Sequence, residues 1–216
     1  MLTVIDGESK QADEINKPDL EARTASYEAR KALLRTNPSL YVSRVRLSVR
    51  QLPLYATDSL LRKIAMHALR EWPKEVKARN RKDLKPEELK VEEEEIEPVK
   101  TKKDGTVIPP ARVRQAKVLR QADRLDPLTG LGRSKGYGFL EVRSHADALK
   151  VLRYCNANSD IMKLLRTWWS DELKAQIEKE EDETRKKRLN EKLSELREGS
   201  EGKKGARTLI LELSIE

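Results

Sequence analysis

The order of strand-like and helix-like segments is the feature that most constrains the fold of this chain. Alternating apolar and polar residues predict strands over residues 43–53, 111–121, 135–142 and 206–216. Apolar residues at helical spacing predict helices over residues 57–72 and 144–158, and Pro73 is expected to end the first of them. Two βαβ halves of this kind make a four-stranded antiparallel sheet backed by two helices, so we expect an α+β fold.

Three further segments surround this predicted core. Residues 17–38 predict a helix with a narrow apolar stripe, Leu20, Tyr27 and Leu34, which either packs on the domain or docks onto another protein. Charged insertions are expected at about residues 74–110, where the chain is predicted to be largely solvated, and at residues 159–205. We therefore divide the chain into an N-terminal arm and helix, residues 1–43, and a domain with two insertions, residues 44–216.

The second insertion begins with 40 residues, 159–198, that contain neither glycine nor proline. They predict helix throughout, either as one long helix or as a hairpin of two helices. Trp168 and Trp169 are neighbours here, and adjacent side chains on a helix point about 100° apart. One tryptophan can then pack inward while the other contacts something else, which makes the pair candidate protein-docking residues.

The charge of the chain is concentrated in one block. The net charge is +8, and residues 44–82 hold 11 basic residues against 3 acidic ones. Such a block favours an anionic partner such as nucleic acid. One cysteine and two histidines make no metal-ligand cluster, and the sequence contains no nucleophile pair or phosphate-cradling loop that would indicate an enzyme or a cofactor. No run of about 18 apolar residues predicts a membrane span.

The segment KGYGFLEV, residues 135–142, places two aromatic residues on a predicted strand. Side chains alternate between the faces of a strand, so Lys135, Tyr137 and Phe139 share one face. On the first predicted strand, Ser48 and Arg50 point away from the core. Two rings and several cations on one face predict either an open platform on which nucleobases stack or a cluster that other parts of the chain cover.

This segment resembles the octapeptide signature of the RNA-recognition motif, which has a basic residue, glycine, an aromatic, glycine or alanine, and an aromatic in this order. Val142 replaces an aromatic at its last position. LSVRQL, residues 47–52, is similar to the companion hexapeptide on the first strand, but Ser48 stands where the family usually has an aromatic. The resemblance implies the ferredoxin-like βαββαβ fold and binding of single-stranded RNA on the open face of the sheet.

A narrower resemblance covers about half of the chain. NPSLYVSRVRLSVRQLP and LILELSIE are similar to the last motif of four-motif nucleolar RNA-binding proteins that act in assembly of the large ribosomal subunit. This implies a location in the nucleus and nucleolus, binding to pre-ribosomal RNA, and other ribosome-assembly proteins as partners. It also implies that the chain is one fragment of a longer protein.

The family's mode of binding assigns expected roles to the outward residues. Tyr137 and Phe139 would stack on bases, and Lys135 would contact a phosphate or a base edge. Arg50 would pair with a phosphate or stack on a base, whereas Ser48 removes a ring and predicts a shorter footprint. Possible contacts with the RNA backbone are expected at the end of the first helix and beyond, from Lys74, Lys77, Arg79, Arg81 and Lys82. The alternative is a protein-docking module whose sheet face is covered.

Overall fold

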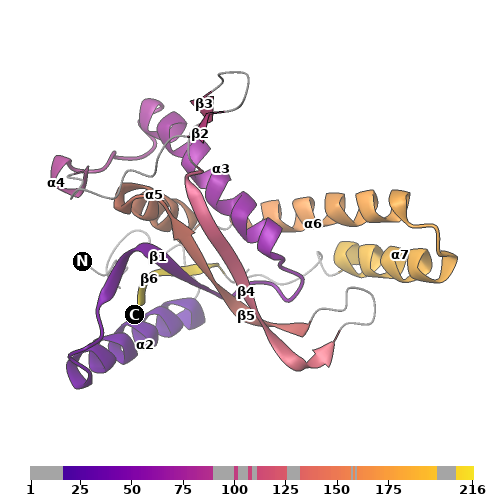
Figure 1. The fold of residues 1–216 in the computed structure, drawn as a ribbon, viewed down its shortest axis with the longest axis horizontal. Helices are drawn as coiled ribbons and strands as arrows, with labels where there is room; N and C mark the ends of the chain where they lie inside the picture. The colour runs from indigo at the N-terminus through magenta and orange to yellow at the C-terminus, as the bar shows by residue number, and fades with distance from the viewer. Residues whose placement is uncertain are drawn as a thin grey trace.

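The structure is a computed structural model, and it describes residues 17–89, 100–101, 107–108, 111–125, 132–156, 158, 160–198 and 208–216. The helices are α2 (Lys17–Thr36), α3 (Asp58–Lys77), α4 (Pro86–Leu89), α5 (His145–Cys155), α6 (Asp160–Lys179) and α7 (Glu183–Glu198) (Figure 1). The strands are β1 (Val42–Arg50), β2 (Lys100–Thr101), β3 (Val107–Ile108), β4 (Val113–Leu125), β5 (Gly132–Val142) and β6 (Ile210–Ile215).

Four strands form one antiparallel sheet in the order β4-β5-β1-β6, and β2 and β3 form a separate two-stranded pair. β1 is central: its Leu47 lies opposite Leu140 of β5 and Leu213 of β6. The predicted α+β fold with a four-stranded antiparallel sheet is confirmed, and the arrangement is compatible with a ferredoxin-like fold.

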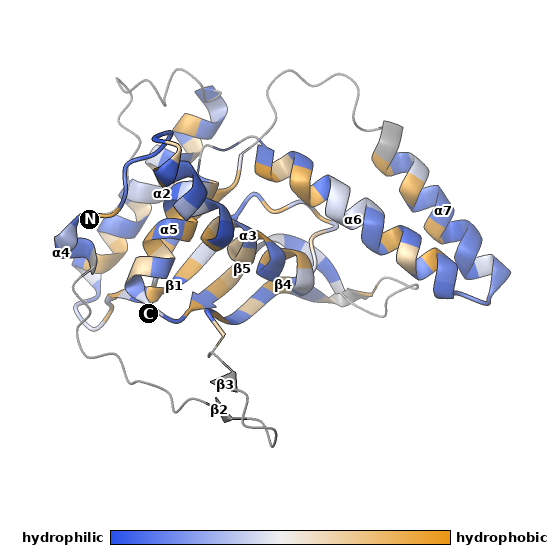
Figure 2. Ribbon diagram, turned by 90° about the horizontal axis from the view of Figure 1, so that it is seen from above, coloured by the Kyte–Doolittle hydropathy of each residue, from blue (hydrophilic) through white to orange (hydrophobic). Residues whose placement is uncertain are grey.

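The core lies between one face of the sheet and the helices α3, α5 and α6. Alternate residues of the strands point into it because side chains alternate along a strand. The buried strand residues include Leu47, Val49, Val118, Leu140, Val142 and Leu211, and the helices contribute Leu61, Ile64, Leu69, Val151, Leu152 and Leu165. Figure 2 shows the same alternation as orange and blue bands along β4 and β5. The predicted inward alternation of KGYGFLEV is confirmed at Leu140 and Val142.

The two glycines of KGYGFLEV are required by the backbone. Gly136 has φ +76°, in the left-handed region that favours glycine, and its carbonyl accepts a hydrogen bond from the N–H of Leu52. At Gly138, a Cβ atom would lie 2.5 Å from the carbonyl oxygen of Lys117 on β4. Any larger residue at position 138 would therefore push β4 and β5 apart.

Both core helices begin at a capping side chain. The Thr57 side chain accepts a hydrogen bond from the N–H of Leu60, and the Ser144 side chain accepts one from the N–H of Asp147. The expectation that Pro73 ends the first helix was wrong, since α3 continues to Lys77. Pro73 is exposed and has no backbone N–H, so it removes one hydrogen bond of α3 without ending the helix. The helix ends at Lys77, shortly before Arg79, whose φ is +59°.

The first insertion is less solvated than predicted. After α3 the chain folds back, and Asp83 accepts a hydrogen bond from the Trp72 indole N–H at 3.1 Å. Leu84 is buried in the core, and Glu88 pairs with Arg153 of α5 at 2.5 Å. The side chains of Asp83, Leu84 and Glu88 thus attach residues 83–88 to the domain, although this part of the sequence is mostly charged. The rest of this insertion lies mostly outside the described residues.

The second insertion forms a hairpin, α6 and α7. Leu165 and Ile161 of α6 are buried in the domain core, while Leu173, Leu189 and Leu193 form a second apolar cluster between the two helices. In Figure 1 the hairpin extends away from the sheet. The sequence left one long helix and a hairpin open, and the structure has the hairpin.

β4 and β5 are longer than predicted. β4 reaches Leu125 and β5 starts at Gly132, and these ends pair with each other past the last residue pair of β5 with β1. The outer edge of β4 meets side chains of α3. Asp58 accepts the N–H of Val118 at 2.7 Å, and Arg62 donates to the carbonyls of Val113 and Arg114.

The free edge of β6 is paired by side chains instead of by a strand. Asn156, directly after α5, donates to the carbonyl of Leu211 and accepts its N–H, both at 2.9 Å. The other groups come from α2, which lies beside β6 in Figure 1. Asp19 accepts the N–H of Thr208, Arg23 donates to the carbonyl of Leu209, and Arg30 donates to that of Leu213.

The spacing of these α2 residues explains why they reach the whole edge. From Asp19 to Arg30 a helix rises about 16 Å, and from Thr208 to Leu213 a strand rises about 17 Å. Buried on α2 are the polar residues Asp19, Ser26 and Arg30, not the predicted stripe Leu20, Tyr27 and Leu34, which is only half-buried. Of the two predicted alternatives, packing on the domain or docking onto another protein, the structure shows packing on the domain. The packing side of the helix is polar.

We predict that Asn156→Ala destabilises the domain by about 2 kcal/mol, because it leaves a buried N–H and a buried carbonyl of Leu211 unpaired. Urea unfolding, followed by circular dichroism, measures this change. Asn190→Ala, at an exposed position of α7, is the matched control and should change stability by less than about 0.5 kcal/mol. Equal stability of the two variants would contradict the role of Asn156 as an edge partner.

Candidate nucleic-acid interface

The face of the sheet opposite the core carries a cross-strand row of polar and aromatic residues. Glu212 of β6, Ser48 of β1, Phe139 of β5 and Lys117 of β4 lie opposite one another in this order. Tyr137 lies in the next row, opposite Arg50. Directly paired residues point to the same side of a sheet, so these side chains share the outward face. The structure therefore brings together all five sheet residues predicted from the sequence, with Lys135 at one end.

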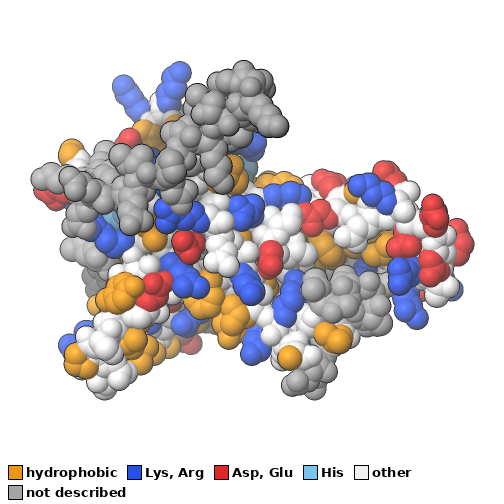
Figure 3. All heavy atoms as spheres, in the orientation of Figure 1, with side chains coloured by type: hydrophobic (Ala, Val, Ile, Leu, Met, Phe, Trp, Pro, Cys, Tyr) orange, Lys and Arg blue, Asp and Glu red, His pale blue; other side chains and the backbone are white. Residues whose placement is uncertain are grey.

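Exposure of this face is graded. Lys135 and Arg50 are exposed, while Tyr137, Phe139 and Ser48 are half-buried. Half-buried rings on an outward face retain surface on which a flat group can stack. Figure 3 shows hydrophobic side chains with Lys and Arg side chains around them where β1 and β5 run in Figure 1.

Arg50 and Ser48 are both tied to β6. The Arg50 guanidinium donates to the Ser26 hydroxyl of α2 at 3.0 Å and lies 3.9 Å from the Glu212 carboxylate. The Ser48 hydroxyl donates to the carbonyl of Glu212 at 3.3 Å. About half of the Arg50 side chain remains exposed (48%), so its contacts fix its position and leave one side open to an anion.

Arg46 and Lys117 also belong to this face, and the sequence reasoning did not single them out. The Arg46 guanidinium lies 5.2 Å from the centre of the Phe139 ring and 3.3 Å from Glu216. A cation at this distance over a ring is held by the ring's negative face. Alternation along β1 indicated that Arg46 faces outward, but its contact with Phe139 depends on a pairing register that the sequence does not contain.

α2 closes the β6 side of this face. Strand alternation places Ile210 and Ser214 on the outward face of β6, yet each is only 4% exposed. Glu212 between them accepts hydrogen bonds from Ser26 and pairs with Arg30. Ile210 lies opposite Arg50 and so points away from the core, but it is buried on this side of the sheet.

The α2 contacts place two guanidinium groups in the protein interior. Burial lowers the pKa of Arg23 and of Arg30, and the nearby carboxylates Asp19 and Glu212 oppose this shift. In the part of the chain that the structure describes, the Nε atoms of both arginines are buried without a hydrogen-bond partner. The interface is therefore polar and incompletely satisfied.

The basic residues predicted to contact the RNA backbone differ in their surroundings. Lys77, Arg79 and Lys82 are exposed, and Lys74 is exposed while pairing with Glu71 at 2.9 Å. Arg81 is instead held inside the domain: it pairs with Glu75 at 2.7 Å and donates to the carbonyl of Arg153. This group lies on α3 and the chain after it, whereas Tyr137 and Phe139 lie on the opposite face of the sheet.

The two tryptophans predicted as docking candidates both pack on the domain, and each is half-buried. Trp169 stacks on Tyr55, with ring centres 6.0 Å apart, and Trp168 meets His67 of α3 edge-to-face at 5.5 Å. His67 also contacts the Tyr154 hydroxyl at 3.3 Å. The pair anchors α6 to α3, so neither ring is presented whole to a partner protein.

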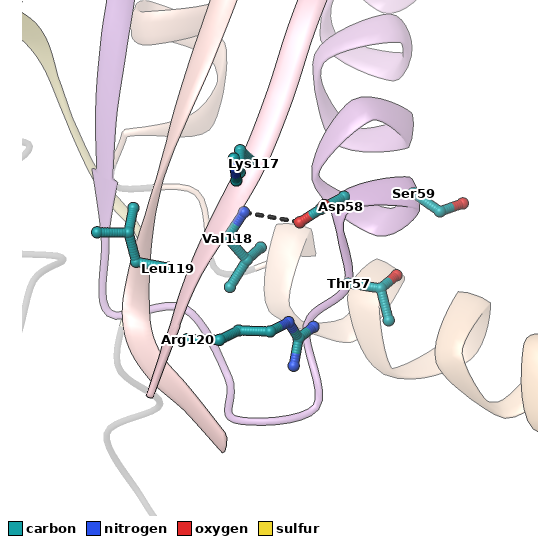
Figure 4. A pocket seen from close by; sticks show the side chains of 7 residues that line it. All are labelled: Thr57, Asp58, Ser59, Lys117, Val118, Leu119 and Arg120. Atoms are coloured by element: carbon teal, nitrogen blue, oxygen red, sulfur yellow. Dashed lines mark hydrogen bonds between the residues drawn. The ribbon is translucent and has the colours of Figure 1, made fainter. Parts of the chain in front are cut away.

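A pocket lies between the start of α3 and β4, where Thr57, Asp58, Ser59 and residues 117–120 line it (Figure 4). Its polar side chains make bonds within the domain. Asp58 accepts the N–H of Val118, and Arg120 donates to the carbonyls of Ala56 and Gly132. These bonds hold α3 against β4, and they account for the residue types found there.

Metal-binding clusters and membrane-spanning helices are missing from the described residues. No group of three or more His, Cys, Asp or Glu side chains in those residues could hold a metal ion. None of the helices described is long and apolar enough to cross a membrane. Cys155 is fully buried, and burial raises the pKa of its thiol to about 12, which keeps it protonated and unreactive.

No model of a protein family matches the chain, and no solved structure matches it to a significant degree.

The His67 contacts generate a prediction about pH. Burial lowers the pKa of His67 below its ordinary value of 6.5. The unfolded chain therefore binds this proton at a higher pH than the folded chain does, so stability is lost as the pH falls through about 6.5. We expect a lower urea midpoint at pH 5.5 than at pH 7.5, with tryptophan fluorescence as the signal.

His67→Gln should reduce this pH dependence, whereas His145→Gln, the other histidine, should retain it. A pH dependence that is the same in wild type and His67→Gln would show that the contact with Trp168 does not depend on a neutral imidazole.

Proposed function

We propose that this chain is an RNA-recognition-motif module that binds single-stranded RNA on the outward face of its sheet. The observation that carries the proposal is the placement of Tyr137 and Phe139, half-exposed on a central strand, with Lys135 and Arg50 beside them. Aromatic rings on a sheet stack on bases of any sequence, and neighbouring cations contact phosphates. The four-stranded antiparallel sheet backed by helices supports the same proposal.

Binding would combine stacking with a limited electrostatic contribution. Each stacked base contributes about 1–3 kcal/mol. Ser48 offers no ring on β1, and Arg46 already lies over Phe139, so a base that stacks there has to displace or lie beside the guanidinium. Tyr137 is then the main stacking residue, and the footprint is shorter than that of a complete motif.

We further propose that the RNA is pre-ribosomal RNA and that the chain is part of a nucleolar factor for assembly of the large ribosomal subunit. This rests on the resemblance of the segments around β1, β5 and β6 to the last motif of the four-motif nucleolar proteins. A basic block at residues 44–82 is consistent with a polyanionic partner.

The proposal predicts that Tyr137→Ala combined with Phe139→Ala weakens RNA binding about 10- to 100-fold, because two stacking surfaces are lost. Fluorescence anisotropy with labelled 12-nucleotide oligouridine and with pre-ribosomal RNA fragments measures the affinity. Circular dichroism shows whether the variant is folded.

Met66→Ala is the control for removing exposed apolar surface, since Met66 is 49% exposed on α3, behind the sheet. Wild-type affinity in the double variant would exclude the sheet face as the RNA site.

A second candidate function is protein docking within a ribonucleoprotein particle, with the α6–α7 hairpin as the docking element. In the described residues, the outer half of the hairpin has an apolar cluster of its own, Leu173, Leu189 and Leu193, and it extends away from the sheet (Figure 2). Such an arm does not contribute to the core of the domain. Its charged outer surface is then free to meet a partner.

For this second function, charge reversal at Lys187 and Arg188, both exposed on α7, should reduce recruitment to pre-ribosomal particles about tenfold while RNA affinity is unchanged. Quantitative co-purification measures recruitment. The same reversal at Arg35 and Lys85, exposed but off the hairpin and outside the predicted RNA contacts, is the matched control and should leave recruitment intact. Full recruitment of the α7 variant would rule out this surface as the dock.

A further inference from the structure

The two sides of the outward face differ in accessibility. On the β6 side, Ile210 and Ser214 are only 4% exposed, and Ser26 and Arg30 of α2 engage Glu212, whose side chain is 15% exposed. On the β4 side, Gln115 and Lys117 are exposed. A strand of RNA that lies on Phe139 can therefore continue over β4, whereas α2 occupies the path over β6.

The charges differ in the same direction. Glu212 is the acidic end of the cross-strand row, and its carboxylate is already shared by Ser26, Arg30 and Arg50. Lys117 is the basic end of the row, directly opposite Phe139. Directly opposite residues of an antiparallel pair have Cβ atoms about 5 Å apart, so an ammonium group at position 117 is within reach of the phosphate of a base stacked on Phe139.

We propose that the RNA site extends from β1 across β5 to β4, with Lys117 contacting the phosphate backbone, and that α2 closes it at β6. This inference rests on the proposed RNA binding. The ligand would then be a short single-stranded RNA segment that lies over β1, β5 and part of β4. α2 sets the length of the site, and Lys117 contributes to affinity without selecting a base.

The contacts that hold α2 on β6 can be weakened by substitution, so its role in limiting the RNA site can be tested. Its buried side is polar, and two buried guanidinium Nε atoms in the described structure have no partner. Ser26 lies 2.8 Å from a Glu212 oxygen, so a carboxylate at position 26 would face that of Glu212 at close range. The substitution Ser26→Glu should therefore detach α2, whereas Ala25→Glu, one residue away and exposed, adds the same charge without this repulsion.

Crosslinking to an 8-nucleotide oligomer of 4-thiouridine, with mass-spectrometric mapping, tests the path on the wild-type chain. We expect crosslinks in the peptides that contain Lys117 and Tyr137 to Phe139, and none in residues 208–216. Crosslinks in residues 208–216 of the wild type would overturn the inference while leaving RNA binding by the sheet in place. If no oligonucleotide binds, the proposed function fails, and the inference fails with it.

Lys117→Ala tests the contact itself. We expect a loss of affinity of about threefold to tenfold for every oligonucleotide sequence, and a salt dependence reduced by about one phosphate contact. Lys179→Ala, at an exposed position of α6, is the matched control and should bind as the wild type does. Equal affinity and equal salt dependence for Lys117→Ala and the wild type would overturn the role of Lys117.

Ser26→Glu tests the boundary. Faster hydrogen exchange at the Thr208 amide, which donates to Asp19, reports release of α2. With α2 released, crosslinks should appear in residues 208–216 and the preference for longer oligonucleotides should increase, whereas Ala25→Glu should behave as the wild type. Release of α2 without new crosslinks would overturn its role as the boundary. If the Thr208 amide remains protected from exchange, α2 has not been released. The wild-type crosslink map and the Lys117→Ala titration then decide whether the proposed RNA path is correct.

Discussion

The pairing of the β6 edge by side chains is the interaction on which the rest of this structure depends. A strand at the edge of a sheet has N–H and C=O groups that need partners when they are buried. Here Asp19, Arg23 and Arg30 of α2 supply them together with Asn156. Because these groups are spaced to follow the strand, α2 is fixed in position, and its Ser26 reaches over the sheet to Glu212.

The same contacts determine how much of the outward face is left for a ligand. Ser26 and Glu212 hold Arg50 at the border between the covered and uncovered parts. Tyr137 and Phe139 lie beyond this border, on a strand in which Gly136 is needed for the backbone geometry and Gly138 for the close approach to β4. A covered part and an exposed part thus coexist in one sheet, because they involve different strands. The outward face is covered at β6 and exposed at β4.

Much of the core could be predicted from the sequence, since it depends on local periodicity. The alternation around Leu47 and Leu140 and the caps Thr57 and Ser144 were evident from short stretches of residues. The α2 contacts were not predictable in this way. Asp19, Ser26 and Arg30 look like a solvated helix face, and only the distant β6 turns them into buried residues.

The errors concerning Pro73 and residues 83–88 have a similar cause. A proline and a charged run are typical of a helix end and of a solvated segment, but here tertiary contacts outweigh the local preference. Trp72 bonds Asp83, and Leu84 enters the core. For the outward face, alternation identified the residues on each strand, while the register that brings Arg46 and Lys117 to Phe139 required the structure.

The bonds that α3 makes to the opposite edge of the sheet have a consequence for how this chain behaves among its own copies. Asp58 and Arg62 occupy backbone groups of β4 just as Asn156 and α2 occupy those of β6. A sheet whose two borders are both engaged by side chains offers few free groups for strand addition. Along these stretches the domain is protected against edge-to-edge aggregation, even in a crowded assembly where many copies and many exposed strands meet.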